Sequence, residues 1–181
     1  AALDKVRKDY PQSRFQNTID EQILATVLQM PDSSDAAGEI LDRMLARIPA
    51  SATTDDRLAA TVGPVGQLIT RKVLLDRAEK LVSDALAACD SPATGVVPGR
   101  GLESLARIQI AKGNTAKGED LYREALKANP ASTVAVTPLV EAYKTRGEFD
   151  AAEAALKGVI KASANATAAL SPTMMLVEVY T

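Results

Sequence analysis

The side chains that most often carry out catalysis are scarce in this chain. It has no histidine and a single cysteine, Cys89. Ser-His-Asp and Cys-His catalysis, zinc sites built on imidazole, and C-x-x-C redox chemistry are therefore excluded within these residues. We interpret Cys89 as a small apolar residue near the end of a helix. No metal site and no cofactor site is predicted.

Two pairs of adjacent acids, Asp55–Asp56 and Glu119–Asp120, are the remaining candidates for acid–base chemistry. On amphipathic helices such pairs are usually solvated, or they interact with the positive N-terminal end of the helix dipole. The segment "GRGLES" from Gly99 is similar to the start of a dinucleotide-binding G-x-G-x-x-G loop, but a serine replaces the third glycine and no strand precedes it. We interpret it as a linker into a helix, so no catalytic residue and no enzyme activity is predicted.

Composition and charge favour a helical protein that does not bind nucleic acid. The 181 residues are 46% hydrophobic but only 3% aromatic. This suits closely packed helices, because strands favour branched and aromatic side chains. The net charge of −2 lacks the basic surplus of a nucleic-acid-binding protein. No apolar run approaches the roughly 18 residues that span a membrane, so an integral membrane protein is not expected. The compartment stays open between the cytoplasm and the bacterial periplasm.

Small and apolar residues that would pack helices together, and so support any binding surface, recur along the chain at a regular spacing. Gly113 and Gly147 are 34 residues apart, and so are Pro138 and Pro172. Small and apolar residues occupy the same offsets in two units, which we place at 99–132 and 133–166. In the first unit they are Leu102, Leu105, Ala106, Gly113, Gly118, Tyr122, Ala125 and Pro130, and in the second Val136, Leu139, Val140, Gly147, Ala152, Leu156, Val159 and Ala164.

The same spacing, moved upstream, fits two less regular units at 18–58 and 59–98. Residues 1–17 then match the end of a preceding repeat, and 167–181 match the first helix of a further one. The four units start 41, 40 and 34 residues apart.

The extra residues in the early units are assigned to two linkers, at 49–56 and 91–100. The second linker is rich in proline and glycine and is expected to form a loop. Linkers of this length would tilt neighbouring repeats away from a regular superhelix.

Two sequence features predict where helices begin. Thr18 and Glu21 form a T-x-x-E capping box, which predicts a helix start at this point. Pro64 and the two prolines named above fall at the sixth position of their units. Because proline is tolerated only in the first turn of a helix, the first helices of the last two units are expected to start late, with Thr137 and Ser171 as N-caps. At Gly118, a glycine inside an expected helix, we expect two helices to cross closely.

A period of 34 residues, with small residues at fixed points of paired helices, resembles the tetratricopeptide repeat. The resemblance implies an all-α fold, an α-solenoid of antiparallel helix hairpins that stack into a right-handed superhelix. About four repeats are expected, with partial helices at both ends. The resemblance also implies protein–protein interaction, with a ligand held against the concave face that the first helices line.

The resemblance places positions 2, 5, 9, 12 and 13 of each unit on this concave groove. The charged residues at these positions are the candidate protein-binding site, namely Arg71, Arg100, Glu103, Arg107, Glu141 and Lys144. The three arginines favour an acidic segment of the partner. Some family members bind a terminal carboxylate through asparagines and lysines here. This chain has no asparagine at these positions and Lys144 as its only lysine, so that role is not predicted.

Two functions are compatible with this reading. The first is a non-catalytic scaffold that binds a peptide or a helical segment in the groove. The second is a repeat module of a larger multidomain enzyme, for example an exported bacterial protein with a thioredoxin-like domain, in which it positions a catalytic domain outside this chain. The final segment "TMMLVEVY" would expose an apolar side. We therefore expect the chain to be a fragment of a longer protein, or its last helix to pack on another molecule, with self-association as one form of this.

Overall fold

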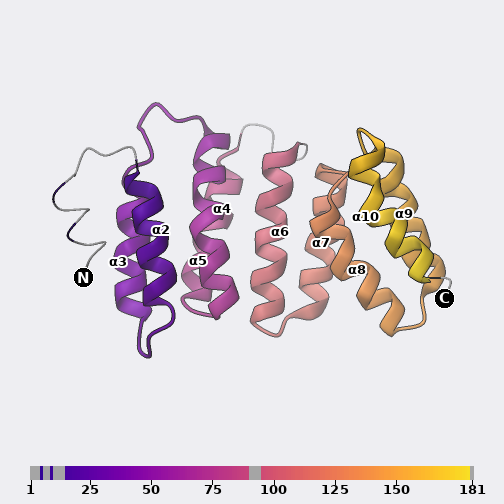
Figure 1. Ribbon diagram of the computed structural model, residues 1–181, viewed down its shortest axis with the longest axis horizontal. Coiled ribbons are helices and arrows are strands. Elements are labelled where there is room, and N and C mark those ends of the chain that lie inside the picture. The colour runs from indigo at the N-terminus through magenta and orange to yellow at the C-terminus, as the bar shows by residue number, and fades with distance from the viewer. Residues whose placement is uncertain (1–4, 6–8, 10–14, 90–94, 180–181) are drawn as a thin grey trace.

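The computed structural model describes residues 5, 9, 15–89 and 95–179 (Figure 1). Within these residues the structure consists of nine α-helices without a strand, so the predicted all-α solenoid is confirmed. The helices are α2 (Gln16–Val27), α3 (Ser34–Leu45), α4 (Thr54–Arg71), α5 (Leu75–Ala87), α6 (Val96–Ala111), α7 (Thr115–Ala128), α8 (Thr133–Thr145), α9 (Phe149–Ala162) and α10 (Ala166–Val179).

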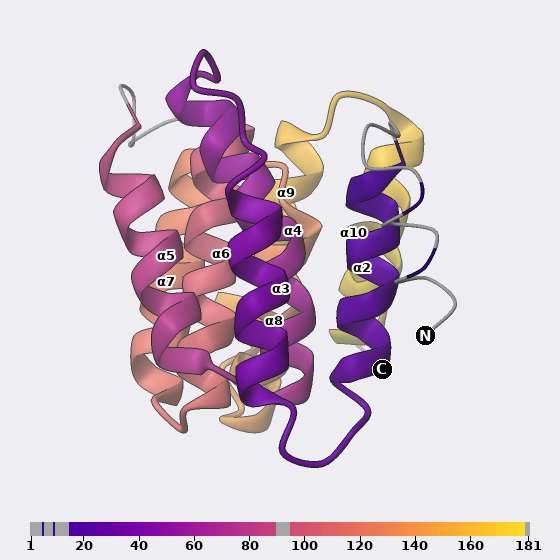
Figure 2. The same ribbon diagram turned by 90° about the vertical axis from the view of Figure 1, so that its left-hand side faces the viewer.

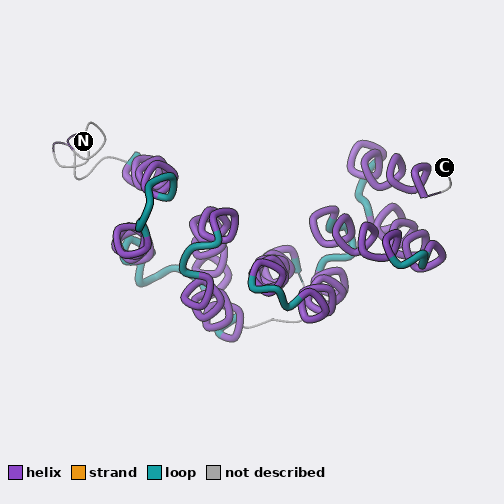
Figure 3. The backbone as a smooth tube through the Cα atoms, turned by 90° about the horizontal axis from the view of Figure 1, so that it is seen from below, coloured by secondary structure: helices purple, strands orange, loops and turns teal. Residues whose placement is uncertain are grey.

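The helices form four antiparallel hairpins that stack side by side, followed by α10. Seen from below, the stack is an arc, with the first helix of each hairpin and α10 on its inner side and α3, α5, α7 and α9 on its outer side (Figure 3). Helices α2 and α10, at opposite ends of the stack, project on the same side (Figure 2). The inner face of the solenoid therefore lies between these two arms.

Left-handed residues close the hairpins. Gly113 and Gly147 have φ angles of 89° and 72°, which glycine adopts without steric cost. Each follows the end of a helix, and the next residue donates its N–H back into the last turn, as Asn114 does to the carbonyl of Gln109 at 2.8 Å. In the α4–α5 turn Lys72 takes this role with a φ of 55°. This turn therefore places an ordinary side chain where the later turns have glycine.

The predicted linkers end earlier in the chain than expected, because the inner helices α4 and α6 extend into them. Helix α4 begins at Thr54 and has 18 residues. Its N-cap Thr53 accepts a hydrogen bond from the N–H of Asp56 at 3.1 Å, which completes a capping box. Residues 54–56 are thus helix, and residues 46–53 connect α3 to α4.

The second linker differs in the same way. Gly95 has a φ of 118°, and α6 begins directly after it at Val96. Residues 96–100, predicted as loop, form the first turns of a 16-residue helix, while residues 91–94 lie outside the described part of the chain. The extra residues thus lengthen inner helices, and the boundaries expected at 59 and 99 fall inside α4 and α6.

The predicted late starts of the last two inner helices are wrong. Ser132 caps α8 and accepts a hydrogen bond from the N–H of Ala135 at 3.1 Å, so α8 starts before Pro138. Thr137 instead lies within the helix and donates to the carbonyl of Thr133 at 2.8 Å. The cap and the packing of α8 offset the one hydrogen bond that Pro138 cannot donate.

Two further starts show that local signals alone did not fix the helix ends. Ser171 lies inside α10. In the first turn of this helix the N–H of Ala168 donates a hydrogen bond to the side-chain oxygen of Asn165 at 2.9 Å. Helix α2 begins at Gln16 rather than at the Thr18 capping box. Gln16 is buried in the first turn, which begins before the capping box.

Small residues allow the helices to approach closely, as the repeat pattern predicted. A Cβ atom added at Gly118 would lie 2.5 Å from Cγ1 of Ile110 and 3.0 Å from the carbonyl oxygen of Ala106. Gly118 therefore permits the close crossing of α6 and α7. Cys89 is buried after α5, in keeping with its role as a small apolar residue.

The apolar core forms three clusters in chain order. The first draws on α2 to α6, the second on α6 to α8, and the third on α8 and α9 with the inward side of α10. On the other side of α10, Leu170, Met174 and Val177 are 59–60% exposed. The predicted apolar face of the last helix is therefore exposed. No helix among the described residues is both long and apolar enough to cross a membrane. Most of the predicted repeat end at 1–17 lies outside the described residues.

Candidate functional site

Two of the predicted groove residues, Arg71 and Arg107, come together on the inner face. Arg71 ends α4, and Arg107 projects from the middle of α6. Both line one pocket of about 380 Å³, whose remaining wall is formed by the second half of α4 and by the end of α2 with the residues that follow it. The two guanidinium groups are 36 positions apart in the sequence and belong to successive hairpins. Stacking of these hairpins places both of them at one cavity.

The three arginines predicted for the groove differ from the other described arginines in their hydrogen bonds and ion pairs. Most described arginines have protein partners: Arg43 and Arg47 pair with Asp20, Arg57 donates to backbone carbonyls, Arg77 pairs with Asp42, and Arg123 and Arg146 pair with Glu119. Among the described residues, Arg71, Arg100 and Arg107 make no hydrogen bond or ion pair. All three side chains are exposed. Their positive charge is therefore not neutralised by the protein itself.

Arg100 lies near this pocket without lining it. It is in the first turns of α6, seven residues before Arg107, so both side chains lie on one side of the helix. Seven residues correspond to about 10 Å along the helix axis. Arg100 therefore extends the positive surface along α6, beyond the pocket that Arg71 and Arg107 share.

Glu103 was predicted to face the groove, but the structure places it inside the contact between α6 and α8. It is only 7% exposed, and its carboxylate accepts a hydrogen bond from the hydroxyl of Ser132. Ser132 is also the N-cap of α8. Glu103 therefore orients a helix cap and is not available to a ligand. The sequence rule missed this contact because Ser132 is 29 positions away.

Glu141 and Lys144 lie on α8, at the other end of the inner face. Their charged groups are 3.6 Å apart, in an ion pair between residues three apart on one helix. The charge of Lys144 is thus largely balanced. The unpaired positive charge of the inner face therefore lies at the end of α4 and along α6, whereas α8 is nearly neutral.

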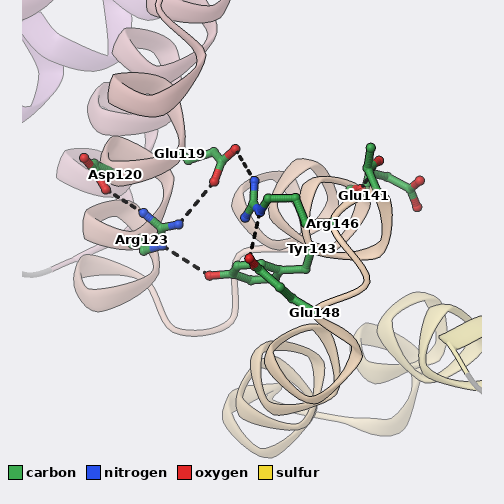
Figure 4. Close-up of polar contacts among 8 residues, drawn as sticks. Glu119, Asp120, Arg123, Glu141, Tyr143, Arg146 and Glu148 are labelled. Atoms are coloured by element: carbon green, nitrogen blue, oxygen red, sulfur yellow. Dashed lines mark hydrogen bonds and ion pairs between the residues drawn. The ribbon is translucent and has the colours of Figure 1, made fainter.

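A polar network that the sequence did not reveal joins α7 to the next hairpin (Figure 4). Glu119 accepts hydrogen bonds from Arg123 at 3.2 Å and from Arg146 at 2.9 Å. Both guanidinium groups lie over the ring of Tyr143, at 5.9 and 5.3 Å from its centroid. Only the Glu119–Arg123 pair, four residues apart, was visible in the sequence. Because both arginines form ion pairs within the protein, they stabilise the packing of the α6–α7 hairpin on the α8–α9 hairpin.

A second network joins α5 to the α6–α7 turn. Glu79 accepts hydrogen bonds from Lys112 and from Gln109, each at 2.7 Å. The Lys112 ammonium holds the pKa of Glu79 below its ordinary value, chiefly through this hydrogen bond. Among the described residues, no group of three or more acids and cysteines lies close enough together to hold a metal ion. Glu79 thus connects the α4–α5 hairpin to the α6–α7 hairpin.

Residues 105–171 match the family model described as tetratricopeptide repeat. This part of the chain is similar to tetratricopeptide repeats. The match runs from the middle of α6 into α10 and covers the units in which the repeat was clearest. Comparison with curated proteins and with solved structures found no match. Tetratricopeptide repeats generally mediate protein–protein interaction, which is the general role that the fold supports for this chain.

Proposed function

We propose that this tetratricopeptide-repeat chain is a non-catalytic scaffold that binds an acidic segment of another protein on the inner face of α4 and α6. The observation that carries the proposal is the pocket in which Arg71 and Arg107 meet without a protein partner. Guanidinium groups bind carboxylates through paired N–H donors, and Arg is enriched where proteins recognise anions.

The alternative for these arginines is an ordinary solvated helix surface, where an ion pair contributes about 0–1 kcal/mol. Two observations favour a binding role. The protein has a net charge of −2 and pairs most of its other described arginines, so acids are not in short supply. In addition, two like charges at one cavity repel each other, and a bound anion relieves this repulsion.

Site-specific photo-crosslinking in the producing cells tests the proposal. A photoreactive phenylalanine at Thr70, beside Arg71 in the pocket, is expected to capture a partner through an acidic segment. The same residue at Asp84, on the outer helix α5, is the positional control. Mass spectrometry of the crosslinked peptide reads the partner sequence at the contact.

Charge reversal then identifies the groups responsible. Arg71→Glu/Arg107→Glu is expected to abolish the Thr70 crosslink. Lys127→Glu/Lys161→Glu, on α7 and α9 of the outer side, makes the same change in net charge and is expected to leave the crosslink intact. Equal crosslinking in both double variants, or a captured segment without acidic residues, would show that the arginine pocket is not the binding site.

The exposed stripe of Leu170, Met174 and Val177 supports a second interaction surface, through which copies of the chain would associate. Sedimentation velocity over a range of concentrations tests it: a mass that rises with concentration and falls back in Met174→Lys supports association through α10. A module that positions a catalytic domain of a larger protein would use the same two surfaces.

A further inference from the structure

The exposed side of α10 has the residue spacing that pairs the two helices of a hairpin. Leu170, Met174 and Val177 stand at positions i, i+4 and i+7 and are 59–60% exposed. Residues with this spacing lie on one side of a helix. We call these three residues the α10 stripe. The opposite side of the helix, with Leu176 and Val179, packs on the third core cluster.

The corresponding residues of α8, one repeat unit earlier in the chain, show what covers such a stripe. Val136 and Val140 are 0% and 1% exposed and share a core cluster with Ala152, Leu156 and Val159 of α9. The three α9 residues have the same i, i+4, i+7 spacing, and α9 is antiparallel to α8 (Figure 1). An antiparallel helix with an apolar stripe of this spacing is therefore what the α10 stripe lacks among the described residues.

The α6–α7 hairpin repeats this arrangement. Ala106 of α6 belongs to one core cluster with Tyr122 and Ala125 of α7. Together with Gly118, which adjoins the carbonyl oxygen of Ala106, these α7 residues again stand at i, i+4 and i+7. The pairing of two such stripes is thus a property of the repeat and not of one hairpin.

A second copy of the chain carries a helix that meets the requirement. If two α10 helices lie antiparallel about a two-fold axis at Met174, Leu170 of one copy is opposite Val177 of the other. Each stripe then covers its counterpart, and the two Met174 side chains meet at the axis. The contact contains only aliphatic and thioether side chains, which need no hydrogen-bond partner when they become buried.

The charge of α10 favours an identical helix in the antiparallel orientation. Glu178 is the only charged residue between Ala166 and Val179, so this helix has little to offer a strongly charged partner. In a parallel pair the two Glu178 carboxylates would lie at the same level and repel each other. Glu178 is four residues from Met174, so in the antiparallel pair the carboxylates are separated by about 12 Å along the helices.

We propose that two copies of the chain associate through the α10 stripe as a two-fold pair of antiparallel α10 helices. This inference rests on the second surface of the proposed function, and it assigns the partner and the geometry of that surface. Because the same residues contribute from both copies, the contact closes on itself and the assembly stops at two. The pocket of Arg71 and Arg107 lies outside the contact, so the dimer carries two such pockets.

Cysteine crosslinking in the full chain tests the geometry. Under mild oxidation, Met174→Cys is expected to form a disulfide-linked dimer, because its two copies meet at the axis. Leu170→Cys alone is expected not to, because its two copies lie about 12 Å apart along the helices, whereas a disulfide needs Cβ atoms about 4 Å apart. An equimolar mixture of Leu170→Cys and Val177→Cys, distinguished by a size tag, is expected to form the mixed dimer.

Two proteins measure the background of this experiment. The unmodified protein contains only the buried Cys89. Lys161→Cys places a thiol at an exposed position near the end of α9, outside the α10 stripe. Both are expected to give at least tenfold less dimer than Met174→Cys on a non-reducing gel. Circular dichroism verifies that every variant is folded, and mass spectrometry of the linked peptides identifies the thiols that reacted.

Sedimentation velocity without oxidation measures the association itself. The unmodified protein is expected to approach twice its mass of 19.1 kDa as its concentration rises, and not to exceed it. Larger assemblies, self-crosslinking of Leu170→Cys or Val177→Cys, or no crosslink in Met174→Cys would each overturn the two-fold antiparallel pair, while association through α10 would stand if Met174→Lys still reduced the mass. A monomer at every concentration would overturn both. The acidic-segment function is judged separately, by the crosslink at Thr70.

Discussion

A methyl group at Gly118 is expected to destabilise the protein, although alanine is the better helix former. In a helix interior, Gly→Ala contributes about 1 kcal/mol of stability through propensity. At Gly118 the new Cβ would stand 2.5 Å from Cγ1 of Ile110 and 3.0 Å from the carbonyl oxygen of Ala106. Ile110 is partly exposed and can move, but the backbone of Ala106 cannot yield without shifting α6. Overpacking of this kind costs about 1–3 kcal/mol, so the net loss is about 1 kcal/mol.

Gly158→Ala is the matched control for this prediction. Gly158 is also helical, and nothing lies within 4 Å of its Cβ position, so only the propensity term remains. This variant should gain about 1 kcal/mol. The two substitutions are chemically identical and differ in one respect, the space available to the added methyl group.

Urea unfolding, followed by circular dichroism, measures both changes in the free energy of unfolding. The comparison requires that the m-value, the dependence of this free energy on urea concentration, is the same in the variants. For a chain of this size, 1 kcal/mol corresponds to about 2–4 °C in Tm, so the opposite signs are resolvable. Introducing Ile110→Ala into both backgrounds separates the two contacts: it should recover only the side-chain part of the cost. A Gly118→Ala protein as stable as Gly158→Ala would refute the claim that the α6–α7 crossing depends on a missing side chain.

Three further predictions concern the turns, the caps and the ion pairs. Lys72→Gly should stabilise the protein by about 1 kcal/mol in urea unfolding, because only glycine adopts this φ of 55° without cost, whereas Lys72→Ala should not. Ser132→Ala removes the cap of α8 and the partner of the buried carboxylate of Glu103, and should cost about 2 kcal/mol, with most of it retained in Ser132→Thr; a loss under about 0.5 kcal/mol would contradict this role. Because the folded state lowers the pKa of Glu79, its contribution to stability is present above the ordinary glutamate pKa and is lost as pH falls from there through the lowered pKa of the folded state. Lys112→Met should therefore show a shallower loss of stability between about pH 5 and pH 3 than the unmodified protein, and identical slopes would count against the ion pair.

The repeat period was enough to predict the architecture, because it reports contacts that recur in every unit. Leu105 and Leu139 occupy the same position in their units, and both are buried. Gly118 was likewise predictable as a close crossing, since a glycine inside a helix lowers its stability unless a neighbouring backbone needs the space. These residues contact neighbours on adjacent helices at fixed offsets, so their surroundings follow from the pattern itself.

What the sequence could not show depends on irregular contacts between distant residues. Glu103 occupies a position assigned to the groove, yet a serine in the loop before α8 draws its carboxylate into the interior. The prolines marked helix starts under a local rule, but caps and packing carry α8 through Pro138. The positions of Arg71 and Arg107 were predictable. That they remain unpaired while other arginines are bonded required the structure.

The division of the core into three clusters has a consequence for how such a protein can change in length. Each cluster draws only on helices adjacent in the stack, and no cluster joins α2 to α10. A hairpin added beyond α10 would therefore contact the third cluster and leave the pocket of Arg71 and Arg107 untouched. The length of the inner face and the chemistry of the arginine pocket can thus vary independently, so the number of repeats can be chosen separately in the design of related proteins.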